Sequence, residues 1–160
     1  MLHKYSFSNF QSFLNRVDVD LTLNRKISLS DWMKEVPTGE RVSKLLAVIG
    51  PNGAGKTALL KPLAFVGWFI SQSFQSLPDA GIPVTPHLAA ANDRLTEFEC
   101  QVDFDSQLWR YVLRCTQQRV VHEALYRKRE RFSYIFVRDW DETSGTYMIK
   151  QQDFGFAPQE

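Results

Sequence analysis

The sequence predicts an α/β fold in which a strand, a glycine-rich loop and a helix precede an antiparallel β-meander. Between residues 45 and 74, an apolar run is followed by closely spaced glycines and then by apolar residues at helical spacing. Residues 96–150 instead hold five runs with strand-like patterns, separated by turn residues. The first pattern is typical of α/β proteins, and the second is typical of half-buried strands joined by hairpins.

Residues 50–57 read G-P-N-G-A-G-K-T and match the phosphate-binding pattern G-x-x-x-x-G-K-[ST], which predicts a P-loop NTPase. The glycines let the backbone curl its N–H groups around a phosphate, and the next helix points its positive end at the same anion. We expect Lys56 to contact the β- and γ-phosphates as the catalytic lysine, and Thr57 to be a ligand of Mg²⁺. The expected cofactors are therefore ATP and Mg²⁺. The expected nucleotide contacts are Pro51, Asn52, Gly53, Ala54, Gly55, Lys56 and Thr57.

The segments on both sides of the loop complete this unit. The apolar run Leu45–Ile49 predicts a strand buried on both faces, and residues 56–74 predict a helix whose stripe includes Leu59, Leu63, Val66 and Ile70. Pro62 removes one helical hydrogen bond, so we expect a bend near residues 58–62. Because this helix is apolar on nearly all sides, we expect it to lie between two layers.

We expect the whole chain, residues 1–160, to form one domain with three parts. Residues 1–76 hold the strands Leu2–Phe7 and Val17–Leu23, the loop and the helix; the intervening residues 24–43 predict a loop with at most a short helix near Ser30–Val36. Residues 77–95 are a proline- and glycine-containing connector, and residues 96–150 form the antiparallel lobe.

Composition excludes several classes of protein. A formal charge of +1 gives no global sign of affinity for nucleic acid or membrane, and the chain has no stretch of 18 apolar residues. We therefore expect a soluble, cytoplasmic protein with no membrane partner. Cys100 and Cys115 lie in strand-like runs and are expected to be buried thiols, while three scattered histidines give no zinc-ligand spacing.

Three further patterns bear on chemistry. The basic cluster Arg127–Arg131 lies at a predicted hairpin tip, where it either contacts phosphates of DNA or RNA or is simply solvated; both interpretations stay open. Asp139, which ends a strand-like run, is a weak candidate for the acid that holds Mg²⁺ in ATPases, because the run belongs to the meander and Arg138 interrupts it. The triplet Asp153–Gly155 imitates the magnesium-binding triplet of protein kinases, but no kinase catalytic loop accompanies it, and we treat it as coincidence.

The chain resembles one family across most of its length. The opening Phe7–Phe13, the loop running into Ala58–Lys61, and the segment Val121–Leu125 resemble the N-terminal part of ABC/SMC-like "AAA family" ATPases of prokaryotic antiphage defence. These include Septu-type, retron-associated and OLD-type ATPases and, more distantly, RecF. The resemblance implies the N-terminal lobe of an ABC-type head that forms homo-oligomers through ATP-sandwiched heads. It also implies a nuclease or other effector partner, an association with DNA or RNA, and a position near the nucleotide for Gln11 and Ser12.

The sequence departs from this family in one respect. The family's signature segment, acidic motif and switch histidine lie in a C-terminal half that has no counterpart here, so hydrolysis is expected to need that half or a partner. Two alternatives to an ATP-binding head stay open. One is a non-hydrolysing interaction module in which nucleotide is a structural ligand, and the other, weaker because no acceptor site or lid is recognisable, is a small-molecule kinase.

Overall fold

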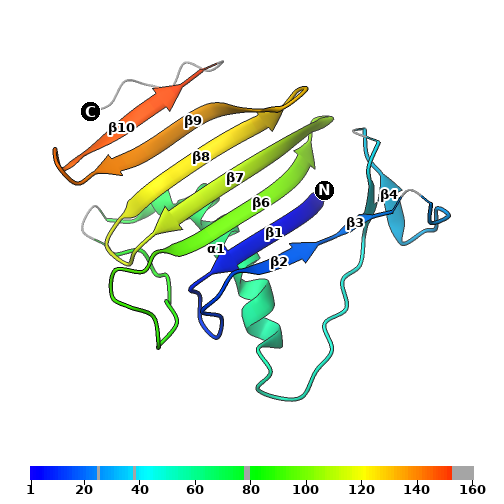
Figure 1. The fold of residues 1–160 in the computed structure, drawn as a ribbon, viewed down its shortest axis with the longest axis horizontal. Helices are drawn as coiled ribbons and strands as arrows, with labels where there is room; N and C mark the ends of the chain where they lie inside the picture. The colour runs from blue at the N-terminus through cyan, green and yellow to red at the C-terminus, as the bar shows by residue number, and fades with distance from the viewer. Residues whose placement is uncertain (25, 38, 78–79, 153–160) are drawn as a thin grey trace.

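A computed structural model describes residues 1–152 except 25, 38, 78 and 79, and within this part the main feature is one seven-stranded sheet (Figure 1). All its neighbouring strands are antiparallel, in the order β10-β9-β8-β7-β6-β1-β2. The strands are β1 (Leu2–Ser8), β2 (Val17–Asp20), β6 (Thr96–Phe104), β7 (Gln107–Cys115), β8 (Val120–Lys128), β9 (Phe132–Asp141) and β10 (Thr146–Gln151). The predicted meander is confirmed.

A smaller sheet precedes the glycine loop. Its strands β3 (Thr22–Leu23), β4 (Met33–Glu35) and β5 (Arg41–Ser43) have the order β3-β5-β4. The predicted single strand over residues 17–23 is therefore divided between two sheets. The predicted short helix near residues 30–36 is wrong, because β4 occupies its centre and pairs with β5. Hydrogen bonding to a neighbouring strand overrides the weak local helix signal here.

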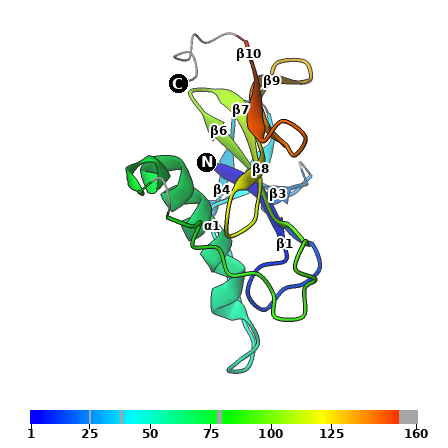
Figure 2. The same cartoon turned by 90° about the vertical axis from the view of Figure 1, so that its left-hand side faces the viewer.

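The helix α1 (Lys56–Gln72), followed by the 3₁₀ turn η1 (Ser73–Gln75), covers one face of the large sheet (Figure 2). It runs through Pro62, and its buried residues are Ala58, Pro62, Val66 and Phe69. The prediction that α1 lies between two layers is wrong for the described residues, because Leu60 and Ile70 on its other side are 48% and 57% exposed. None of the described helices is long and apolar enough to cross a membrane.

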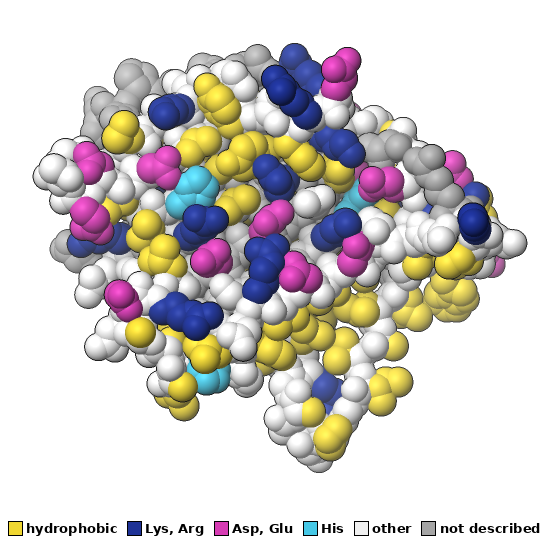
Figure 3. Space-filling model, viewed as in Figure 1, with side chains coloured by type: hydrophobic (Ala, Val, Ile, Leu, Met, Phe, Trp, Pro, Cys, Tyr) yellow, Lys and Arg dark blue, Asp and Glu magenta, His cyan; other side chains and the backbone are white. Residues whose placement is uncertain are grey.

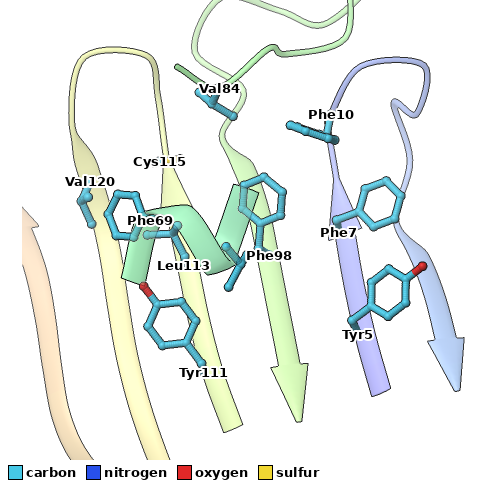
Figure 4. Packing of buried hydrophobic residues seen from close by; sticks show 11 residues of the cluster. Tyr5, Phe7, Phe10, Phe69, Val84, Phe98, Tyr111, Leu113, Cys115 and Val120 are labelled. Carbon is cyan, nitrogen blue, oxygen red and sulfur yellow. The ribbon is translucent and has the colours of Figure 1, made fainter. Parts of the chain in front are cut away.

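Aromatic side chains form the core between α1 and the sheet (Figure 4). The ring of Phe65 on α1 stacks on that of Phe98 on β6, with centroids 4.8 Å apart. Phe10, just after β1, meets Phe98 edge to face at 5.3 Å. Aromatic pairs of this kind contribute about 0.5–1.5 kcal/mol each beyond the burial of their area. They fix the middle of α1 to β6 and to the segment just after β1.

The face of the large sheet turned away from α1 is a mosaic of both charge signs (Figure 3). Its ion pairs join neighbouring strands, as in Arg114 with Glu97 at 3.5 Å and Lys4 with Asp20 at 2.8 Å. Such exposed pairs each contribute at most about 1 kcal/mol to stability. On the helix side, Cys115 is buried and Cys100 half-buried, and both are free thiols, as predicted.

The predicted buried strand over Leu45–Ile49 is absent. These residues form an irregular segment between β5 and α1 (Figure 1), with Leu45 58% and Ile49 93% exposed. An apolar run becomes a strand only beside other strands that bond its N–H and C=O groups. Among the described residues, no strand pairs with this segment.

Candidate functional site

The glycine loop enters α1 through two left-handed glycines. Gly53 and Gly55 both have φ of +81°, a conformation that costs other residues about 1–2 kcal/mol. Gly55 is the N-cap of α1 and offers no side-chain hydrogen bond to the first turn, and that described turn contains no acidic residue. The first backbone N–H groups and the positive end of the helix dipole are therefore not neutralised locally, and they suit an anion.

Lys56 lies folded over the loop. Its Nζ donates hydrogen bonds to the carbonyl oxygens of Gly50 at 2.8 Å and Pro51 at 2.7 Å. These carbonyls hold the ammonium group next to the helix N-terminus, so the cation already lies where a phosphate bound there would meet it. Thr57 is exposed, which leaves its hydroxyl accessible to a metal ion.

The turn between β1 and β2 supports the loop from one side. A Cβ added to Gly55 would lie 3.4 Å from the Phe13 ring and 4.0 Å from the Ser12 Cβ. Ser12 therefore lies beside the loop, and its implied position near the nucleotide stays a prediction. The backbone N–H of Gln11 instead donates a hydrogen bond to the carbonyl oxygen of Thr85 in the connector, at 2.8 Å.

Asn9, inside the opening Phe7–Phe13, is a structural residue of the site. Its fully buried side chain donates to the Arg94 carbonyl at 2.8 Å and accepts from the His87 N–H at 3.0 Å. Its φ of 52° belongs to the left-handed region, which asparagine tolerates better than most residues. In the sequence, the only sign of this role is a polar Asn among the phenylalanines of residues 7–13. The residue ties the connector to the turn that supports the loop.

The carboxylate proposed as a magnesium-binding acid lies elsewhere. Asp139 is on β9, separated from β1 by three strands of the sheet, and its Oδ1 is 2.6 Å from Nδ1 of His122. It is paired across two strands of the lobe, so the weak prediction for this residue is not supported by its position. The triplet 153–155 lies outside the described residues.

Comparison with known protein families gives a direct match. The family described as "AAA domain, putative AbiEii toxin, Type IV TA system" matches residues 45–153, more than half of the chain. The chain belongs to this family. It is therefore an AAA/P-loop ATPase-like domain, a class that uses ATP and Mg²⁺. No curated protein matches the chain.

The loop of this AAA domain fits the cofactors of its class. The positive end of α1 and the ammonium group of Lys56 suit the phosphates, and the Thr57 hydroxyl is an oxygen ligand of the kind that Mg²⁺ takes. The matched segment begins at Leu45, so it includes both the apolar segment and the loop.

Proposed function

We propose that this AAA domain binds Mg²⁺-ATP through residues 50–57 as the N-terminal lobe of an ABC-type head. The observation that carries the proposal is the helix N-terminus at Gly55, which has no side-chain cap and no acidic residue in its first turn. Lys56 adds a cation beside it, and the glycines at positive φ permit close approach of the backbone to phosphate. When bound, Mg²⁺ supplies charge neutralisation of the phosphates.

The exposed segment Leu45–Ile49 supports the further proposal that the head is completed by other strands. Leu45, Leu46 and Ile49 are 58%, 43% and 93% exposed, although the run has the composition of a fully buried strand. Strands from a C-terminal half or a partner would bury this run and place the missing acidic groups beside the loop. Hydrolysis then depends on that completion, because Asp139 is held by His122.

The biological role that we propose is antiphage defence, in an ATPase of the Septu, retron-associated or OLD type. The opening motif at residues 7–13 and the family description, which names a toxin system, support this role. The proposed partners are a second head across shared ATP and a nuclease or other effector.

Calorimetric titration with Mg²⁺-ATP tests the binding proposal. We expect saturable binding that Lys56→Ala weakens by at least tenfold, while Lys61→Ala, an exposed lysine of the same helix, leaves it unchanged. Equal affinities of the two variants would contradict the proposed role of Lys56. The absence of ATP binding by the unmodified chain would favour an interaction module instead.

A further inference from the structure

An open groove of about 910 Å³ lies at the end of the molecule opposite the glycine loop. It is bounded by the C-terminal end of α1 and the helix-side face of β6–β9. Because α1 has 17 residues, the groove lies about 25 Å along the helix from the loop. Its lining includes aromatic residues such as Phe104 and Trp109, the arginines Arg127 and Arg138, and the carboxylates Asp105 and Glu123.

The aromatic walls are presented to solvent. Phe74 is 77% exposed and Phe104 is 72% exposed, which is unusual for side chains of this size. Trp109 lies directly across the β7–β8 pair from Arg127, whose guanidinium is 5.7 Å from the centre of the Trp ring. An aromatic surface and a cation thus share one side of the groove.

Of the two carboxylates that line the groove, Glu123 is neutralised by its neighbours, whereas Asp105 is exposed in the turn between β6 and β7. Glu123 accepts a hydrogen bond from the Tyr111 hydroxyl at 2.7 Å, and its other oxygen lies 2.6 Å from Nη2 of Arg138. Burial and the nearby Glu123 raise the pKa of Tyr111, which keeps the phenol protonated as the donor. The Glu123 carboxylate therefore does little to repel an anionic ligand.

Arg127 lines the groove and is the first residue of a basic cluster, here called the basic rim. The cluster Arg127–Arg131, at the end of β8 and in the turn to β9, contains four cationic side chains and one carboxylate. Arg129 and Arg131 are exposed. On the opposite face of the same hairpin, Arg110 packs between the rings of Tyr126 and Phe132, at 4.4 and 4.6 Å, and this packing stiffens the hairpin.

We propose that this groove binds single-stranded nucleic acid, with bases stacking on Trp109 and Phe104 and phosphates meeting the basic rim. The phosphates of a nucleic acid complement the positive charge of Arg127–Arg131. The unpaired bases of a single strand are planar and can stack on the aromatic surface beside this cluster. The sequence of Arg127–Arg131 is compatible both with nucleic-acid binding and with a simply solvated hairpin tip. The exposed aromatic groove beside Arg127 favours nucleic-acid binding. The inference does not depend on nucleotide binding at the loop.

Fluorescence anisotropy with labelled twenty-nucleotide oligo(dT) and oligo(U), at two salt concentrations, tests the proposal on the full chain. We expect binding that weakens steeply with salt and falls about tenfold in Arg127→Glu. A similar loss of about five- to tenfold is expected in Trp109→Ala, because one stacking surface disappears. The two oligomers decide between DNA and RNA as the preferred strand.

Three control variants make the result specific. Arg114→Glu reverses a charge on the opposite face, where Arg114 pairs with Glu97, and should leave affinity within twofold. Lys56→Ala should also bind the oligomers normally, which separates this site from the ATP site. Trp109→Phe keeps an aromatic surface and should retain most of the affinity. No binding at low salt, equal losses in Arg127→Glu and Arg114→Glu, or tighter binding of a duplex of the same length would overturn the proposal.

Discussion

The hydroxyl of Tyr5 donates a hydrogen bond to the carbonyl oxygen of Leu59 at 3.0 Å, and this contact joins the first strand to the helix just beyond the glycine loop. Tyr5 is only 3% exposed, and burial raises the pKa of its phenol, so the group stays a donor over the working pH range. The start of α1 is thereby fixed relative to β1. The orientation of the loop's N–H groups follows from that attachment.

Removal of the Tyr5 hydroxyl should loosen this attachment. We expect Tyr5→Phe to lower the free energy of unfolding by about 1 kcal/mol, because one buried hydrogen bond is lost while the ring packing remains. Urea unfolding measures the change. Tyr126→Phe, whose ring lies in the lobe beside Arg110, is a matched control that should leave the free energy of unfolding nearly unchanged. A Tyr5→Phe protein as stable as the unmodified chain would show that the bond contributes nothing.

Substitution of Gly55 tests the conformation of the loop. Gly55→Ala places a methyl group at φ +81° and 3.4 Å from the Phe13 ring, so we expect at least tenfold weaker Mg²⁺-ATP binding and a loss of stability of about 1–2 kcal/mol. Gly67→Ala is the control. A Cβ there meets no neighbouring atom within 4 Å, and alanine favours the helix, so stability should rise by about 0.4–1 kcal/mol. The two variants should move the urea midpoint in opposite directions, and a shift in the same direction would contradict the assignment of strain to Gly55.

These two glycines show what could be predicted from the sequence. The pattern at residues 50–57 and the helical spacing after it depend on neighbours in the chain, so the loop and the extent of α1 follow from local rules. The alternation over residues 96–105 likewise predicts β6, with Phe98, Cys100, Val102 and Phe104 on one face. Phe98 and Cys100 of this face lie in or against the core, but Phe104 is 72% exposed. Local spacing was sufficient where one segment determines its own conformation.

Other features depend on partners distant in the sequence. The apolar run 45–49 has the composition of a buried strand, but its conformation depends on strands that no described residue provides. The role of Asn9 depends on the carbonyl of Arg94 and the N–H of His87, which are about eighty positions away. The groove is also invisible in the sequence, because it appears only when Trp109 and Arg127 pair across β7 and β8. Sequence spacing does not encode such contacts.

Asp103 should make stability depend on pH. Burial opposes ionisation of this carboxyl, but the attraction of the N-terminal ammonium of Met1, 2.8 Å from Oδ1, outweighs it, and the pKa of Asp103 is lowered. A pKa lower in the folded than in the unfolded protein stabilises the fold above the unfolded value of about 3.9. This contribution is lost as the pH falls through the folded value.

The matching variant is Asp103→Asn. At pH 7 its melting temperature should be lower than that of the unmodified protein by a few degrees, and this difference should narrow at pH 3, below the unfolded pKa of about 3.9, as the pH approaches the lower folded pKa of Asp103. Thermal unfolding followed by circular dichroism at both pH values measures this difference. A gap that persists unchanged at pH 3 would assign the effect to packing rather than to charge.

Hydrogen exchange should distinguish the segment at residues 45–49 from the sheet. Its backbone lies in no helix or strand and Ile49 is 93% exposed, so its amides should exchange within seconds, at rates near those of an unfolded chain. Amides of β7 around Leu113, which is fully buried in the core, should be protected by the free energy of global unfolding. Mass spectrometry of peptides that cover 44–50 and 108–115 measures both in one experiment.

Strands that complete the head should slow exchange at 45–49 by several orders of magnitude, because each amide of a formed strand then donates to a neighbour. Strong protection of 45–49 in the chain alone would contradict both the exposed segment and the proposal that other strands cover it.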